Sequence, residues 1–210
     1  MNKVYQKINN IIQLLLIKVY FKKYLKLLSP GKVAIDCGAN LGNVTIRLAK
    51  TGAEVHAFEP NPYAFEVLTE KLKPYKNVTC YPQGVWDKDA TTDLYFHNSA
   101  TNDQAFWSFG SSIIEQKHNV GKSKSVAVKI IDLTKFIEEL DKPVELLKID
   151  IEGAECELLE KFIEKELYRK VRMTLVETHD GKIKGQKVKT DKIRSLIKEK
   201  QIKNINLNWL

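Results

Sequence analysis

An acidic residue followed by two glycines gives this chain its clearest chemical signal. Asp36 lies in an apolar stretch that begins at Val33, and Gly38 and Gly42 follow before a helical pattern. Glycine lets the backbone turn sharply and lets a ligand approach it closely, and the first amides of a helix point into the same space. Because a strand, a glycine turn and a helix N-terminus form the usual nucleotide pocket of a doubly wound sheet, we expect a nucleotide-like ligand here.

The spacing of the glycines distinguishes between two cofactors. A dinucleotide fingerprint needs Gly-x-Gly-x-x-Gly, and its three glycine positions fall on Asp36, Gly38 and Leu41, so only the middle one is met. A carboxylate at the first position repels a pyrophosphate but suits the amino group of S-adenosylmethionine (SAM), which carries no phosphate. The loop therefore favours SAM over NAD, and a strand–helix turn without a ligand is the alternative.

A second acidic residue supports a cofactor with a ribose. Glu59 ends the next apolar strand, 23 positions after Asp36. This is close to the interval of roughly 20 residues at which an acidic residue meets ribose hydroxyls in such units. A carboxylate can accept hydrogen bonds from both hydroxyls, so we expect Glu59 to bind the ribose. The alternative is a solvated acid at a strand end.

Three further residues could remove a proton from a hydroxyl. Asp150 and Glu177 end two more apolar strands, and His179 follows the second. Ligands bind outside the carboxyl ends of the strands in an open α/β sheet, so these acids should gather with Asp36 and Glu59. Each of the three is a candidate general base, with His179 titrating nearest neutrality unless it is a surface histidine. Together they could instead hold a divalent metal, but without a tightly spaced carboxylate cluster we expect none.

The order of elements must place these residues at one edge of a sheet. Strands are expected over 54–59, 78–81, 144–151 and 171–178, and helices over 43–50, 63–72 and 153–166. This alternation predicts an α/β fold, a doubly wound and mostly parallel sheet with helices on both faces. Two extra strands, 92–96 and 126–131, flank a polar loop over 97–125, where we expect acceptor specificity to lie.

The composition restricts the number of domains, the binding partners and the compartment only broadly. The 210 residues suit one core, and the net charge of +8 does not choose among nucleic acid, anionic lipid and acidic substrates. Three isolated cysteines indicate a reducing cytoplasm. We expect a basic helical extension over 1–28 and one catalytic domain over 29–210. The extension reads either as a helix packed on the domain or as weak peripheral contact with a membrane or partner, and its apolar run is too short to span a bilayer.

Several motifs together resemble a known family, the FkbM-type SAM-dependent methyltransferases. They are Ile35-Asp36-Cys37-Gly38-Ala39-Asn40-Leu41-Gly42, Ala57-Phe58-Glu59-Pro60-Asn61-Pro62, Gly110-Ser111-Ser112, Ile131-Asp132-Leu133, Leu147-Lys148-Ile149-Asp150-Ile151-Glu152-Gly153-Ala154-Glu155 and Val176-Glu177-Thr178-His179. The resemblance runs in order from about Gly31 to His179, and Asp-Ile-Glu-Gly-Ala-Glu is its most specific element.

The resemblance implies a class I methyltransferase (Rossmann-like) fold with SAM as methyl donor. Its assigned members mostly methylate hydroxyls of sugars, polyketides and other small molecules. Asp36 and the loop residues Gly38, Ala39, Asn40 and Gly42 would hold the methionine end of SAM, Glu59 the ribose, and Gln83, Gly84 and Val85 the adenine. The sequence departs from the family pattern at Gly84, where alanine is common, and in the lysine-rich tail after His179.

Three functions are compatible with the sequence. The one we expect is O-methylation of a hydroxyl on a small molecule or glycan, with no nucleic acid as partner. RNA methylation is an alternative that the positive charge supports. A non-catalytic protein that binds a partner through residues 1–28 is another, and whether the chain forms a homodimer is open.

Overall fold

The computed structural model describes residues 21–97, 108, 111–114 and 120–209. The helices are α2 (Lys22–Leu25), α3 (Thr45–Ala49), α4 (Pro62–Leu72), α5 (Leu133–Glu139), α6 (Glu155–Glu164), α7 (Gln186–Glu199) and the 3-10 helix η1 (Leu167–Arg169). The strands are β1 (Val33–Cys37), β2 (Glu54–Phe58), β3 (Val78–Tyr81), β4 (Gly84–Trp86), β5 (Ala90–His97), β6 (Val120–Asp132), β7 (Val144–Ile149), β8 (Thr174–Val176) and β9 (Ile205–Asn206).

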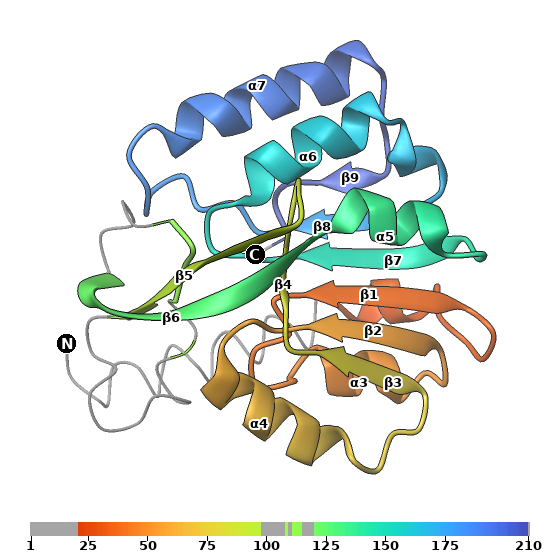
Figure 1. The fold of residues 1–210 in the computed structure, drawn as a ribbon. Helices are drawn as coiled ribbons and strands as arrows, with labels where there is room; N and C mark the ends of the chain where they lie inside the picture. The colour runs from red at the N-terminus through yellow and green to blue at the C-terminus, as the bar shows by residue number, and fades with distance from the viewer. Residues whose placement is uncertain (1–20, 98–107, 109–110, 115–119, 210) are drawn as a thin grey trace.

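The main sheet confirms the expected doubly wound fold. Its strands run in the order β3-β2-β1-β7-β8-β9, and every neighbouring pair is parallel. The order reverses between β1 and β7, which is where such folds bind their ligands. In Figure 1 the helices α5, α6 and α7 are drawn on the side away from α3 and α4.

Both faces of the central strand are buried. All five residues of β1 are inaccessible; Val33, Ile35 and Cys37 belong to one apolar cluster, and Ala34 belongs to another. The first cluster also contains Phe162 of α6, whereas the second contains Leu48 of α3. This double burial explains why β1 reads as a continuous apolar run rather than an alternating one.

A second, three-stranded sheet includes both ends of the expected loop over 97–125. Its order is β4-β6-β5, and β6 starts at Val120, so the expected strand over 126–131 is too short. Residues 121–125 read Gly-Lys-Ser-Lys-Ser, which lacks the apolar alternation that marks a strand. The prediction of a loop was wrong for that part, and residues 98–107, 109–110 and 115–119 lie outside the description.

The tail after His179 is a regular part of the fold, although the sequence analysis assigned no helix or strand to it. It forms α7 and the edge strand β9. Only Ile193 among the apolar residues of α7 is fully buried, and Val188 is 75% exposed. The short apolar face and the many lysines hide the helical period, so this element is missed by pattern alone.

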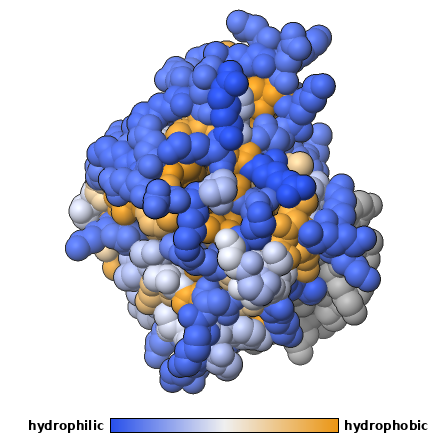
Figure 2. Space-filling model, turned by 90° about the vertical axis from the view of Figure 1, so that its right-hand side faces the viewer, coloured by the Kyte–Doolittle hydropathy of each residue, from blue (hydrophilic) through white to orange (hydrophobic). Residues whose placement is uncertain are grey.

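The first described residues pack on the domain. Phe21 is fully buried, and its ring lies 5.7 Å from that of Trp209, centroid to centroid. Residues 1–20 of the expected extension lie outside the description. No helix within the described part of the chain is long and apolar enough to cross a membrane. Figure 2 shows the molecule from the right of Figure 1, where mostly hydrophilic side chains cover the surface.

Candidate active site

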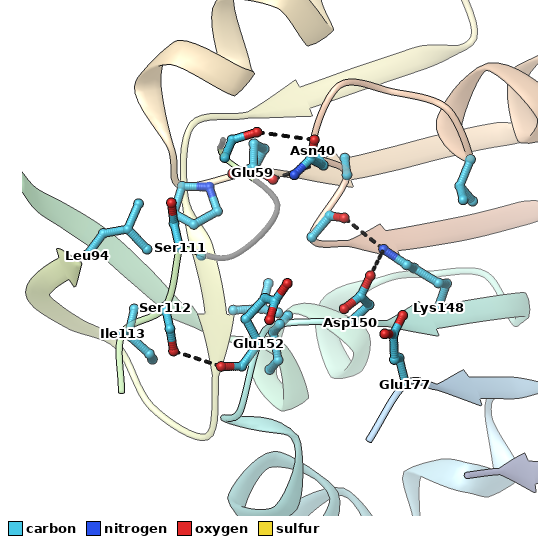
Figure 3. Close-up of a pocket in the computed structure, with 18 of the residues that line it drawn as sticks. Asn40, Glu59, Leu94, Ser111, Ser112, Ile113, Lys148, Asp150, Glu152 and Glu177 are labelled. Atoms are coloured by element: carbon cyan, nitrogen blue, oxygen red, sulfur yellow. Dashed lines mark hydrogen bonds and ion pairs between the residues drawn. The ribbon is translucent and has the colours of Figure 1, made fainter. Parts of the chain in front are cut away.

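A cavity of about 330 Å³ opens where β1, β2, β7 and β8 end. Its walls fall into two parts, which Figure 3 shows facing each other. We call the part formed by Gly38, Ala39, Asn40 and Glu59 the loop end. We call the part formed by Asp150, Glu152 and Glu177 the acid end. The volume is within the usual range for small-molecule sites.

The glycine loop at the loop end depends on close backbone packing. Gly38 has φ +78°, and a Cβ on it would lie 1.9 Å from the carbonyl oxygen of Asp150. Gly42 has φ +82° and does not itself line the cavity, whereas Gly38, Ala39 and Asn40 do. The glycine spacing therefore serves the turn and the contact between two strand ends.

Glu59 is the charged group of the loop end. Its two oxygens accept hydrogen bonds from the backbone amides of Asn40 (2.7 Å) and Asn61 (2.9 Å), and the residue is 6% exposed. Burial raises the pKa of Glu59 to about 7, against the opposing effect of the two amides. The sequence placed this carboxylate correctly at a strand end beside the glycine loop.

Asp36 lies behind the cavity wall and does not line it. It is fully buried, accepts a hydrogen bond from the Thr45 hydroxyl (2.7 Å), and pairs with Lys148 Nζ at 3.2 Å. Asp36 therefore stabilises the glycine loop indirectly, because Lys148 also donates to the carbonyl oxygen of Gly38. Any contact of Asp36 with a cofactor therefore stays a prediction.

Lys148 lines the cavity and was not among the candidate residues of the sequence analysis. Its ammonium donates to the carbonyl oxygens of Cys37 (3.2 Å) and Gly38 (2.7 Å) and lies 3.4 Å from Asp150 Oδ2. Burial alone would lower the pKa of Lys148, but Asp36 and Asp150 outweigh it and raise that pKa. A lone lysine inside the apolar strand β7 is the signal that could have found it, because a buried charge needs partners.

The three residues expected around adenine separate into two groups. Gly84 and Val85 line the cavity from β4, whereas Gln83 does not. A Cβ at Gly84 would lie 2.5 Å from Ile130 Cδ1 of β6. This atom is the far end of a flexible side chain, so an alanine at position 84 would require only that the Ile130 side chain shift.

The acid end brings two of the three candidate bases to the cavity. Asp150 and Glu177 line it, as does Glu152. Burial raises the pKa of both, and the charge of Asp150 helps to raise that of Glu177 to about 7. His179 is 1% exposed and stands behind these carboxylates, outside the cavity lining.

His179 is surrounded by carboxylates. Its Nδ1 lies 2.9 Å from Glu155 Oε1, and its Nε2 lies 3.1 Å from Glu152 Oε2. Burial alone would lower the pKa of His179, but Glu152 and Glu155 outweigh it and raise that pKa to about 10. Glu155 also accepts from the amides of Ile151 (3.1 Å) and Gly153 (3.0 Å), so this glutamate fixes the loop of the Asp-Ile-Glu-Gly-Ala-Glu motif.

The second sheet brings the serine motif over the cavity. Ser112 exchanges two backbone hydrogen bonds with Tyr95 of β5, and its hydroxyl donates to the Glu152 carbonyl oxygen at 2.7 Å. The hydroxyl of Ser111 accepts from Asn61 Nδ2 at 3.3 Å. Figure 3 shows the contact between Ser112 and Glu152. Since the backbone amide of Asn61 donates to Glu59, the two serines connect the acid end with the loop end.

The fold is that of an α/β domain with a cavity at the carboxyl ends of its strands. The chain belongs to the FkbM methyltransferase family: the model of the methyltransferase FkbM domain matches residues 36–202. This confirms the family resemblance and makes SAM the cofactor of the domain.

The chain is also similar to individual known proteins, at low sequence identity. The chain is 25% identical over 162 residues to Methyltransferase 1 of Beauveria bassiana (70% of this chain, 65% of that protein) and 29% identical over 150 residues to hexuronic acid methyltransferase AglP of Haloferax volcanii (70% and 55%). It thus spans 55% to 65% of the length of these two relatives. A solved Streptococcus mutans protein in complex with S-adenosylhomocysteine (SAH) matches with a TM-score of 0.49 and 14% identity, over 87% of this chain and 81% of that one.

Proposed function

We propose that this protein transfers the methyl group of SAM to a hydroxyl of a small molecule or glycan. One observation carries the proposal: a single cavity joins a glycine loop with a buried carboxylate to a cluster of acids at neighbouring strand ends. The first part suits the cofactor, and the second suits an acceptor that must lose a proton. When bound, SAM supplies a methyl group activated by a positively charged sulfur.

The residues of the loop end fit SAM. Glu59 is buried with its carboxylate at the cavity, so ribose hydroxyls would find a desolvated acceptor there. Gly38, Ala39 and Asn40 would hold the methionine end, and Gly84 and Val85 would flank the adenine.

Glu177 is our candidate for the general base. It lines the cavity, and its side chain is 24% exposed, so an acceptor hydroxyl can reach it. Asp150 is already paired with Lys148, and His179 does not reach the cavity. Transfer needs the hydroxyl held close to the methyl group while Glu177 accepts its proton.

Calorimetric titration with SAH tests the cofactor part of the proposal. Wild type should bind SAH, Glu59→Ala should lose that binding, and Glu66→Ala should bind as wild type does. Glu66 is the matched control because it is an exposed acid on the neighbouring helix α4. Tighter binding of NAD, or no binding of SAH to a folded protein, would overturn the assignment.

Methyl-labelled SAM then tests the acceptor class. The panel should contain simple sugars, hydroxylated small molecules and RNA, and the likeness to AglP adds glycans that contain hexuronic acid. Label in a hydroxyl of a sugar or small molecule supports the proposal. Label in RNA would favour RNA methylation. SAH binding without label in any acceptor would favour a non-catalytic protein that binds a partner.

We also propose a cytoplasmic location, which the free thiols of Cys37, Cys80 and Cys156 support. The domain limits at 29–210, the contact through residues 1–28 and a homodimer stay predictions. Gel filtration with light scattering tests the dimer.

A further inference from the structure

His179 is a buried polar side chain that faces the acid end. Its ring is inaccessible to solvent, and neither ring nitrogen makes a hydrogen bond of good geometry with the described residues. Nε2 points toward three carboxylate oxygens, those of Glu152 (3.1 Å), Asp150 (3.8 Å) and Glu177 (4.0 Å). Without a cation, the neighbouring carboxylates keep a proton on this imidazole, because they raise the pKa of His179 to about 10. A divalent cation would take the place of the Nε2 proton among the same carboxylate oxygens and release that proton.

The spacing around Nε2 is that of a cation site. Asp150, Glu152 and His179 each offer one ligand atom, and the three atoms lie within 4.8 Å of one another. Ligands about 2.1 Å from one cation lie about 3.0 Å apart when adjacent and about 4.2 Å apart when opposite. The separations of 3.1 Å and 3.8 Å from Nε2 lie within that range.

The surroundings of His179 are those of a metal ligand. Its other ring nitrogen, Nδ1, lies 2.9 Å from the buried carboxylate of Glu155. Metal-ligating histidines generally turn their second nitrogen to a carboxylate or carbonyl, which fixes the ring and directs the free nitrogen at the metal. Glu155 is itself fixed by the amides of Ile151 and Gly153.

The local charge also favours a cation. Three carboxylates line the acid end, while Lys148 is shared with Asp36 on its other side. Lys182 is the other lysine that lines the cavity, so the three carboxylates of the acid end outnumber the two lysines.

We propose that Asp150, Glu152 and His179 bind a divalent cation of the Mg²⁺ or Mn²⁺ class. Carboxylates suit both ions, and the single imidazole makes Mn²⁺ the better probe. This replaces the sequence-based expectation of no metal, because the close approach of the three side chains exists only in the folded chain. The role of the cation rests on the proposed function: it would bind the acceptor hydroxyl beside Glu177 and make its proton easier to remove.

Electron paramagnetic resonance of Mn²⁺ tests the site directly, because bound Mn²⁺ loses the sharp signal of the free ion. The wild-type chain, stripped with a chelator, should remove one Mn²⁺ per chain from solution. Asp150→Asn and His179→Gln should bind at least about tenfold more weakly. Glu164→Gln, an exposed acid at the end of α6, should bind as wild type does.

The result that overturns the proposal is an undiminished Mn²⁺ signal with folded wild type, or equal binding by wild type and Asp150→Asn. Nε2 then carries a proton and pairs with the same carboxylates. Asp150 is partly exposed, so its isosteric variant keeps the test valid if His179→Gln does not fold.

SAH calorimetry on the same metal-free preparations separates the two proposals. SAH binding without Mn²⁺ binding overturns the cation site alone. Mn²⁺ binding without SAH binding overturns the cofactor assignment and leaves the site as a metal site of another function.

Discussion

The loop end and the acid end of the cavity are built in different ways. The loop end consists of backbone from one short turn, with the single carboxylate of Glu59. The acid end consists of side chains that follow two different strands, β7 and β8. Lys148 and His179 hold its carboxylates together from behind. A site made of backbone depends on glycine geometry, whereas a site made of charges depends on counter-charges.

Removing the shared lysine should have the largest effect on the protein itself. Lys148→Met leaves the buried carboxylate of Asp36 without its cation, which should lower the free energy of unfolding by about 3–5 kcal/mol. Lys142→Met removes an exposed pair with Glu54 and should cost less than about 1 kcal/mol. Urea denaturation measures both, and equally small losses would show that Lys148 does not support the two ends.

Changing the acid end alone should affect the reaction more than the cofactor. Glu177→Gln should lower the rate of methyl transfer by about 10²–10⁴-fold, because the amide cannot accept the hydroxyl proton. Its affinity for SAH should stay close to that of wild type. Glu199→Gln, an exposed acid of α7, serves as control. A large loss of SAH affinity in Glu177→Gln would contradict the division between the two ends.

Changing the backbone of the loop end should affect both ends. Gly38→Ala and Gly31→Ala share a left-handed φ, of +78° and +84°, and each should lose about 1–2 kcal/mol for that alone. At Gly31 nothing lies within 4 Å of the added carbon, whereas at Gly38 the Asp150 carbonyl oxygen blocks it. Gly38→Ala should therefore cost a further 1–3 kcal/mol, roughly, and weaken SAH binding. Equal stability of the two variants would rule out the contact.

The pH dependence of cofactor binding should be the smallest effect. Ribose hydroxyls need the ionised form of Glu59, whose pKa is raised to about 7, so SAH affinity at pH 6 should be about tenfold below that at pH 8. Calorimetry on wild type and Glu59→Gln measures this, and the variant should lose the dependence. A similar pH profile in both would assign the titration to another group.

The raised pKa of Glu59 also determines how its contribution to the stability of the fold changes with pH. The folded protein holds the Glu59 proton up to about pH 7, whereas the unfolded chain releases it near the ordinary value of 4.5. The contribution of Glu59 to stability therefore falls as the pH rises between these two values.

The loop end could be predicted from sequence because its parts are neighbours in the chain. The run from β1 to β3 was predicted within two residues at most boundaries, and Glu59 was placed by its distance from the glycine loop. Asp36 belongs to the same run, but its side chain contacts Lys148 and Thr45, and its contact with the cofactor stays a prediction.

The acid end could be predicted only in part. Asp150 and Glu177 were expected to meet, because strand ends of a parallel sheet share one edge. The depth of His179 depends instead on how Glu155 of α6 and the loop after β8 pack, which no local pattern encodes. Likewise, the charge of Lys148 in β7 finds its partner in β1, more than a hundred residues earlier.

The position of Lys148 also has a thermodynamic consequence. One ammonium holds the Gly38 carbonyl oxygen with one proton and faces the Asp150 carboxylate with another. A ligand that shifts this ammonium at the loop end changes the free energy of binding at the acid end, and the reverse change must be equal. Binding of the cofactor at the loop end and of an acceptor at the acid end would then be linked, and the apparent affinity of each would depend on the concentration of the other.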